Sequence, residues 1–332
     1  MKISEFPSAV IKENVDYTVK EITNVIKKYG PRESGNDACY DAEKHLKKEL
    51  DQFSDETHFE EYKMAPKAFL HFTKIVSSVI MAAVVICLAL VFTNVISFMI
   101  AQCIVGALVA IGLFITVMEF LMYKQFMDGM YKKVTGHNLV ATRKPTGEVK
   151  KRIVISGHID AAYEWHIYYF KQHGMGPLMG GTIVCAIISV IVAVVAVIAD
   201  NVNMGAFGDF MVNYSYYFHV LTALFMISLL CFVDFRRISP GANDNLTGTY
   251  AAVCALRMLD MAGVEFENTE VVAMITDGEE AGLRGAKAFA KAHHDEYTSG
   301  DVKTAVLCVD TLTDMDYFNV YSKDMSGTVK ND

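Results

Sequence analysis

The ten residues TDGEEAGLRG, Thr276–Gly285, decide how the rest of the chain is interpreted. Before them, segment 269–276 (TEVVAMIT) is apolar and β-branched over a length that suits a buried strand. After them, segment 281–294 contains few β-branched residues and predicts a helix. Glu279 and Glu280 therefore stand at the carboxyl end of a strand, where open α/β sheets keep their binding sites.

Neighbouring carboxylates repel each other, so a functional Glu279–Glu280 pair requires a cation or a shared proton. Taken alone, such a pair is more often a solvated acidic turn that caps a helix. Similar side chains, however, follow two more predicted strands, 152–156 and 304–309, and precede a predicted helix, 246–261. Together they form one set of candidate ligands: His158, Asp160, Asp244, Glu279, Glu280 and Asp310.

This set contains metal ligands but no cysteine. Imidazole with several carboxylates suits zinc or another borderline divalent ion, and one carboxylate can bridge two ions about 3.5 to 4 Å apart. His158 and Asp160 are two residues apart, so they lie on one face of an extended chain, where Asp160 can fix the histidine tautomer. Each residue alone has an ordinary alternative, His158 as a satisfied core histidine and Asp244 as a helix N-cap. Their joint position at the ends of elements favours a metal site.

Apolar residues make up 52% of the 332 residues and gather in two blocks. Between Lys74 and Glu119 lie 44 uncharged residues, enough for two membrane spans of about 20 residues each, with a turn at Asn94. Two further uncharged runs of 26 and 24 residues occupy 174–199 and 210–233. Apolar core helices are a poor alternative for runs of this length. The sequence therefore predicts four transmembrane helices in two hairpins.

Basic residues flank the spans on the side shared by the polar segments, whereas the hairpin tips hold no Lys or Arg. By the positive-inside rule we expect an integral protein of the plasma membrane whose polar domain is cytoplasmic, with the lipid bilayer as a partner. Seven cysteines without a C-x-x-C pair agree with a reducing compartment. A net charge of −8 argues against a nucleic-acid partner.

The polar segments combine into one α/β sandwich that the hairpins interrupt, because predicted strands alternate with predicted helices. Helices are expected over 15–29 and from about 34 to 53, and further strands over 57–63 and 137–142. The expected division is a first part of the polar domain at 1–68, hairpin one at 69–124, a second part at 125–172, hairpin two at 173–235 and a third part at 236–332.

Several motifs resemble one family, the co-catalytic di-zinc exopeptidases of metallopeptidase family twenty-eight, which includes bacterial leucyl aminopeptidase and aminopeptidase Y. GHID at 157–160 is similar to the family's G-H-x-D, GANDNLTG at 241–248 to G-A-x-D-x-x-S-G, and DGEEAGLRGAKAF at 277–289 to E-E-x-G-L-x-G-S. VLCVD at 306–310 fits the strand that carries the next ligand, and GPRESGND at 30–37 resembles the N-terminal helix connection. The resemblance covers about half of the chain. It implies a three-layer α/β/α sandwich with a mixed sheet, of the zinc exopeptidase type.

The family pattern also implies the roles of the ligands. It makes Asp244 the ligand that bridges two zinc ions, places His158 and Asp310 on one zinc and Glu280 on the other, and makes Glu279 the general base. Asp160 joins the catalytic group as the partner of the histidine. The implied substrate is a short peptide that loses its N-terminal residue.

The chain departs from the family pattern at the second zinc. The family takes a fifth ligand, a histidine, from further along the chain, but no histidine follows His294 and only 22 residues follow Asp310. We therefore expect the natural chain to continue beyond Asp332, with two zinc ions in the complete protein and one tightly bound ion in these 332 residues.

Three functions from different classes fit the sequence. The first, which we favour, is a membrane-anchored zinc exopeptidase of the aminopeptidase type. The second is an inactive relative that serves as a membrane scaffold, and the third is carboxypeptidase or glutaminyl cyclase chemistry on the same site. A transporter is disfavoured, because His219 is the one ionisable side chain inside the predicted spans besides cysteine and tyrosine.

Overall fold

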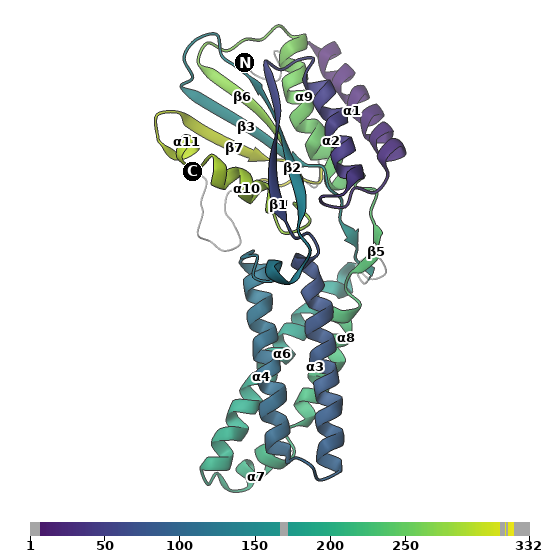
Figure 1. Cartoon of the computed structure of the whole chain (residues 1–332), viewed down its shortest axis with the longest axis vertical. Helices are drawn as coiled ribbons and strands as arrows, with labels where there is room; N and C mark the ends of the chain where they lie inside the picture. The colour runs from purple at the N-terminus through teal and green to yellow at the C-terminus, as the bar shows by residue number, and fades with distance from the viewer. Residues whose placement is uncertain (1–6, 167–171, 313–315, 317, 322–332) are drawn as a thin grey trace.

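The structure is a computed structural model that describes residues 7–166, 172–312, 316 and 318–321. It consists of a domain built on a five-stranded sheet and a bundle of long helices at one end of that domain (Figure 1). The chain enters the bundle twice, so the sheet domain is assembled from segments that are far apart in the sequence.

The sheet has the strand order β1-β2-β6-β3-β7. β2 (Val134–Arg143) runs antiparallel to both of its neighbours, β1 (Glu56–Met64) and β6 (Thr269–Thr276). β3 (Lys151–His158) runs parallel to β6 on one side and to β7 (Lys303–Cys308) on the other. This mixed sheet confirms the predicted α/β class, and it brings the carboxyl ends of β6, β3 and β7 to one edge.

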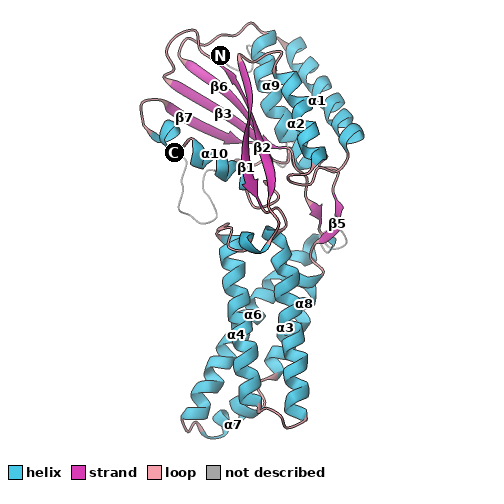
Figure 2. Cartoon of the chain, viewed as in Figure 1, coloured by secondary structure: helices cyan, strands magenta, loops and turns pink. Residues whose placement is uncertain are grey.

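Helices cover both faces of the sheet (Figure 2). One face carries α1 (Ser8–Tyr29), α2 (Asp37–Leu50) and α9 (Thr247–Met261), and the other carries α10 (Arg284–Ala292), which the short α11 (His294–Thr298) follows.

The side chains of β6 alternate between these two layers. Val271, Ala273 and Ile275 are buried in the core that α1, α2 and α9 share. Val272 and Met274 are buried with Phe289 of α10. Successive residues of a strand point to opposite faces, so one apolar strand serves two cores and the domain has three layers.

Three helical stretches in the bundle are long and apolar enough to cross a membrane. They are α3 (Ala68–Phe92), α4 (Phe98–Thr116) with its continuation to Leu121, and Gly176–Asn201 within α6 (Gln172–Asn201). The fourth predicted span is not a single helix. It consists of α7 (Gly205–Asn213) and α8 (Tyr217–Leu230), which are bent by 43° and count as one span only when taken together.

A buried glutamine explains how this bend is tolerated. The Nε2 atom of Gln102 in α4 donates to the carbonyl oxygens of Met211 (3.0 Å) and Val212 (3.1 Å). Its Oε1 atom accepts a hydrogen bond from Ser215 (2.7 Å). Because an unpaired backbone group in hydrocarbon costs several kcal/mol, a break in a span needs such partners. Gln102 is uncharged, so the length of the uncharged run does not reveal this polar contact.

The helix predicted over 281–294 begins only at Arg284. Gly282 (φ +90°) and Leu283 (φ +60°) are left-handed and end the preceding turn. A Cβ atom on Gly282 would lie 2.6 Å from the ring of Phe69 in α3, so this position accepts only glycine. The loop that carries Glu279 and Glu280 therefore rests on the first turn of the bundle.

Other boundaries also shift. The first helix begins at Ser8 rather than near residue 15, and the second starts at Asp37 because the Asn36 side chain caps it at the backbone N–H of Cys39 (2.7 Å). A two-stranded sheet of β4 (Tyr163–Glu164) and β5 (Asp234–Ile238) was not predicted. It pairs the segment that enters the second part of the bundle with the segment that leaves it.

Arg284, the first residue of α10, joins the two parts of the molecule. Its guanidinium group is 1% exposed and lies 2.9 Å from Glu119, in the helical turn that continues α4, and 2.6 Å from Asp128. Glu119 is fully buried and also accepts a hydrogen bond from the backbone N–H of Met127 (3.0 Å). This ion pair fixes α10 to the end of the first hairpin.

Replacing Arg284 by leucine should destabilise the protein by about 3–5 kcal/mol, because the carboxylate of Glu119 would stay buried without its partner. Thermal unfolding of the purified protein in detergent measures the effect. The control is Arg236→Leu, which removes an arginine that is 88% exposed and paired with Asp234, and which should leave the unfolding temperature almost unchanged because solvent screens that pair. Equal, small losses in both variants would contradict the proposed importance of the buried pair.

Candidate metal centre

His158 ends β3 near the centre of the carboxyl edge of the sheet, and its side chain is 3% exposed. Its Nδ1 atom lies 3.1 Å from the backbone oxygen of Asp160. Because a carbonyl oxygen can only accept, Nδ1 carries a hydrogen and Nε2 is the ring nitrogen left to bind a metal. Burial lowers the pKa of His158, but its contacts with Asp160 and Asp244 outweigh burial and raise that pKa well above its usual value, so a metal that binds Nε2 displaces a proton. Nε2 is buried and has no hydrogen-bond partner among the residues that the structure describes. Metal-binding histidines are held in this way.

Three carboxylates surround this free nitrogen. Nε2 of His158 lies 3.1 Å from Asp244, 3.7 Å from Glu279 and 3.9 Å from Asp310, and the shortest of these contacts lacks the alignment of a hydrogen bond. His158, Asp244 and Asp310 offer one ligand atom each within 4.8 Å of one another, and so do His158, Glu279 and Glu280. The structure thus brings five of the six predicted side chains together at His158.

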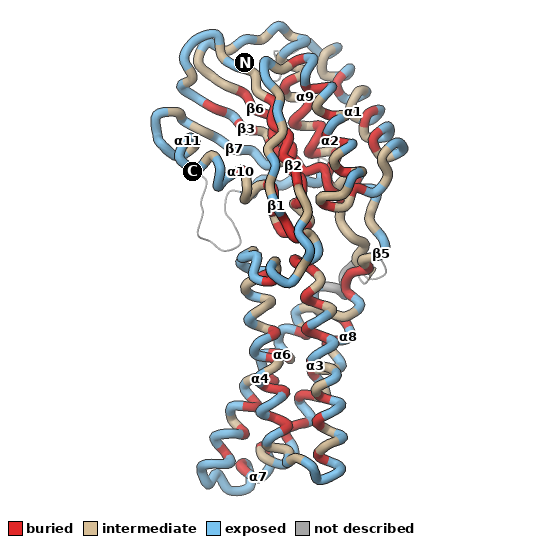
Figure 3. Tube along the Cα trace, viewed as in Figure 1, coloured by how far each residue is buried: buried red, intermediate tan, exposed pale blue. Residues whose placement is uncertain are grey.

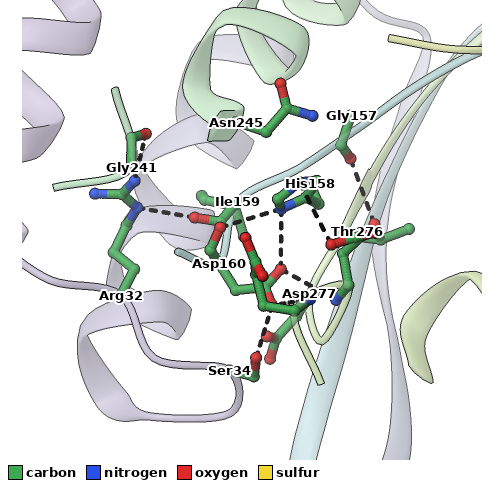
Figure 4. Close-up of polar contacts among 12 residues, drawn as sticks. Arg32, Ser34, Gly157, His158, Ile159, Asp160, Gly241, Asn245, Thr276 and Asp277 are labelled. Carbon is green, nitrogen blue, oxygen red and sulfur yellow. Dashed lines mark hydrogen bonds and ion pairs between the residues drawn. The ribbon is translucent and has the colours of Figure 1, made fainter. Parts of the chain in front are cut away.

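Asp160 lies behind His158 and is fully buried (Figure 4). One of its oxygens accepts hydrogen bonds from the Ser34 hydroxyl (2.6 Å) and the Glu280 N–H (3.0 Å), and the other accepts from the Glu279 N–H (3.2 Å). Burial opposes ionisation, but hydrogen bonds from His158, Ser34 and the Glu280 N–H outweigh it and hold the pKa of Asp160 below its usual value. Asp160 is therefore an anion that orients both His158 and the Glu279–Glu280 turn.

A second buried carboxyl group, Asp277, also belongs to this network (Figure 4). Burial and the charge of Asp160 raise the pKa of Asp277 well above its usual value, so Asp277 holds a proton. It accepts a hydrogen bond from the backbone N–H of Gly35 (3.0 Å). Of these two neighbouring buried acids, Asp160 is charged and Asp277 is neutral, which limits the electrostatic repulsion beneath the site.

Arg32 connects the loops that carry His158 and Asp244. Its fully buried guanidinium group donates to the carbonyl oxygens of Ile159 (2.8 Å) and Gly241 (3.0 Å) (Figure 4). Arg32 and Ser34 lie in a segment that resembles the family's motif, but neither residue was predicted to have a role. The one available signal was their place in the GPRESGND motif, because a buried arginine and an exposed one look alike in a sequence.

Asn245 connects the Asp244 loop to the Asp310 loop. Its Nδ2 atom donates to the Val309 carbonyl oxygen (2.9 Å), and its Oδ1 atom accepts from the backbone N–H groups of Gly248 (2.9 Å) and Thr311 (3.3 Å). The capping contact that was the ordinary alternative for Asp244 is therefore made by Asn245. The carboxylate of Asp244 remains directed toward His158.

Burial raises the proton affinity of Glu279, Glu280 and Asp310. The pKa of Glu279 rises to about 7 through burial, although the nearby His158 opposes the shift. Burial and the charge of Glu279 raise the pKa of Glu280 well above its usual value, and burial raises that of Asp310. A cation that binds here displaces these protons, so metal affinity should rise with pH.

The donor set fits zinc, because it combines one imidazole nitrogen with several carboxylate oxygens around a buried, unpaired Nε2. A second group, Cys39, Glu43 and Asp277, also has ligand spacing. Burial raises the pKa values of all three residues, so they stay protonated and are poor ligands. No second histidine joins the His158 cluster in the described ranges.

The sequence profile of Peptidase family M28 matches residues 225–325, the segment that contains Asp244, Glu279, Glu280 and Asp310. Residues 225–325 belong to peptidase family M28. The resemblance deduced from the motifs is thereby confirmed for this part of the chain. The M28 segment begins inside α8 and extends past β7. No curated protein matches the chain.

Several solved structures are similar at low identity. They include a glutaminyl cyclase from Fimbriiglobus ruber (14% identity, 89% of this chain and 60% of that chain, TM-score 0.43), a leucine aminopeptidase precursor from Bacteroides thetaiotaomicron (12%, 89% and 61%, 0.41) and a zinc aminopeptidase from Bacillus subtilis (11%, 89% and 69%, 0.40). The chain spans about three fifths of the length of the first two. These TM-scores are too low to carry an argument about function.

Replacing Asp160 by asparagine should weaken zinc binding by about 10- to 100-fold, because the charge that orients His158 is lost. Competition with a chromogenic chelator measures the affinity. The matched control is Asp295→Asn, which removes an exposed carboxylate in α11 and should leave the affinity unchanged. If both variants bind zinc as tightly as the unaltered protein, Asp160 does not support the metal ligand.

Proposed function

We propose that this protein is a membrane-anchored, zinc-dependent exopeptidase of the aminopeptidase type, which removes N-terminal residues from short peptides. The observation that carries the proposal is the buried Nε2 of His158, unpaired within the described part of the chain and surrounded by carboxylates from three different loops. The family match supports it, because residues 225–325 contain three of the four expected metal ligands and the expected base.

His158 and Asp310 would hold one zinc ion, Asp244 would be shared, and Glu280 would face a second ion. When bound there, zinc supplies Lewis acidity toward the scissile carbonyl group and lowers the pKa of a nearby water. Within these residues the second ion has one ligand fewer than the first, so the first ion should bind more tightly.

Glu279 is suited to move the proton. Its side chain is 31% exposed, so a substrate can reach it, and it lies 3.7 Å from Nε2 of His158. Because Glu279 is not one of the expected metal ligands, its carboxylate is free to take up a proton from the nearby water and to give it to the leaving amine. The hydrogen bond from its N–H to Asp160 holds the backbone of Glu279 in place.

The bundle supports anchoring in a bilayer. Large apolar side chains point outward along its length, among them Val85 (67% exposed), Ile111 and Leu224, and the tube in Figure 3 is largely unburied there. Exposed apolar surface of this extent is stable in lipid rather than in water.

The site would lie near the membrane surface, because Asp244 is only ten residues after Asp234, which stands at the end of the bundle. Such a position would favour apolar peptides as substrates.

Glu279→Gln should keep zinc and lower peptidase turnover by about 10² to 10⁴, because the general base is removed while the ligands stay. Hydrolysis of aminoacyl and peptide substrates by the purified protein, with zinc content measured in parallel, tests this. Glu265→Gln changes an exposed carboxylate and serves as the control. Unchanged turnover in Glu279→Gln would exclude Glu279 as the base, and a zinc-loaded unaltered protein without turnover would support the scaffold alternative.

The orientation of the protein in the membrane is tested by cysteine labelling in a variant whose exposed Cys103, Cys231 and Cys308 are replaced by serine. By the positive-inside rule, single cysteines at Asn94 and at Asn203 should react from outside intact cells.

Cysteines at Lys150 and Ser299 should react with the same probe only after permeabilisation. The opposite labelling pattern would place the sheet domain outside the cell.

A further inference from the structure

The helical bundle contains an apolar cavity of about 380 Å³ among α3, α4, α6 and α8. This volume falls in the range of about 300–1,000 Å³ that is typical of ligand sites. Along α3 the lining extends from Phe72 to Ile80, which is eight residues or about 12 Å of helix. The cavity is therefore elongated along the bundle. Further lining residues are Val109, Leu113, Met179, Ala186 and Met226.

The lining offers almost no group to a polar ligand. Among the residues that the structure describes, the lining contains no charged side chain. Its three threonines, Thr73, Thr116 and Thr182, each donate to a backbone carbonyl oxygen of their own helix, at 2.7, 2.8 and 2.9 Å. Because a polar molecule would lose its hydration here without compensation, the occupant must be mainly hydrocarbon.

Trp165 is the exception. It lines the cavity, and its indole N–H is buried without a hydrogen-bond partner in the described portion of the chain. A buried donor that stays unpaired costs about 1–3 kcal/mol. A ligand that brings one hydrogen-bond acceptor to this position would remove that cost.

The Trp165 end of the cavity lies next to the sheet domain. Trp165 and Met179 pack against the cluster of Phe69, Leu70, Phe232 and Val233, and the ring of Phe69 covers Gly282 in the Glu279–Glu280 turn. In a bilayer this end is at the depth where tryptophan side chains meet the polar interface. The Ile80 end reaches further into the hydrocarbon region.

We propose that this cavity binds one acyl chain of a membrane phospholipid, whose ester carbonyl oxygen accepts a hydrogen bond from Nε1 of Trp165. The long axis, the apolar lining and the indole donor of Trp165, unpaired among the described residues at the interface end, match a hydrocarbon chain that terminates in a carbonyl group. Phospholipid is the source because it surrounds the bundle in the membrane. The inference rests on the membrane placement of the proposed function but not on peptidase activity.

Photolabelling of the full chain tests the proposal. The protein is reconstituted in phosphatidylcholine vesicles that contain phosphatidylcholine with a diazirine in one acyl chain, and the labelled residues are mapped by mass spectrometry. Label should appear on cavity residues such as Leu113 and Met179 in addition to outward-facing residues such as Ile111. Label on outward-facing residues alone would overturn the proposal.

Two variants and a control sharpen the test. Ala186→Phe fills the cavity and should abolish the cavity label, whereas Ile187→Phe changes the adjacent outward-facing residue and should leave it intact. Trp165→Phe keeps an aromatic ring but removes the donor, so the cavity label should fall roughly twofold to tenfold. A cavity label that is unaffected by both Ala186→Phe and Trp165→Phe would contradict the assignment.

A competition experiment distinguishes the source of the acyl chain. Unlabelled phosphatidylcholine should displace the cavity label. If an N-acylated peptide displaces it and phosphatidylcholine does not, the phospholipid assignment is wrong. Because the label is read out without turnover, this result does not depend on whether the protein is a peptidase.

Discussion

The buried carboxylate of Asp160 is the group on which the candidate site depends. A charge without solvent is costly unless polar partners surround it, and Asp160 accepts hydrogen bonds from Ser34 and from the Glu279 and Glu280 N–H groups and lies 3.4 Å from Nδ1 of His158. These partners come from three separate parts of the chain. The same anion therefore assembles the loops and holds His158 with its Nε2 atom directed at the acidic cluster.

The bundle and the site are joined at three points rather than at a flexible linker. Arg284 is ion-paired with Glu119 below the start of α10, and Phe69 lies against Gly282 in the same turn. The β4–β5 pair joins the two segments that lead to the second part of the bundle, close in sequence to His158 and Asp244. A change in packing at the top of the bundle would thus reach the turn that carries Glu279 and Glu280 directly.

Much of this arrangement could be predicted from the sequence, because it depends on patterns that are local. The strand at 269–276, the positions of Glu279 and Asp310 after strands, and the apolar blocks all follow from periodicity and charge. The contacts of Arg32, Ser34 and Gln102 could not be predicted, because they join segments that are distant in the chain and involve side chains that are common on surfaces. The late start of α10 was missed for a different reason. Leu283 adopts a positive φ angle that its residue type does not favour, so its residue type gives no sign that the helix starts only after it.

The proposed function requires that His158 and the surrounding carboxylates bind zinc. X-ray absorption spectroscopy at the zinc edge of the purified, zinc-loaded protein tests it most directly. The expected shell contains nitrogen and oxygen at roughly 2.0–2.2 Å and no sulfur, and it should lose its imidazole signal in His158→Ala. A sulfur atom at roughly 2.3 Å, or a shell that His158→Ala leaves unchanged, would place the metal elsewhere and contradict the account.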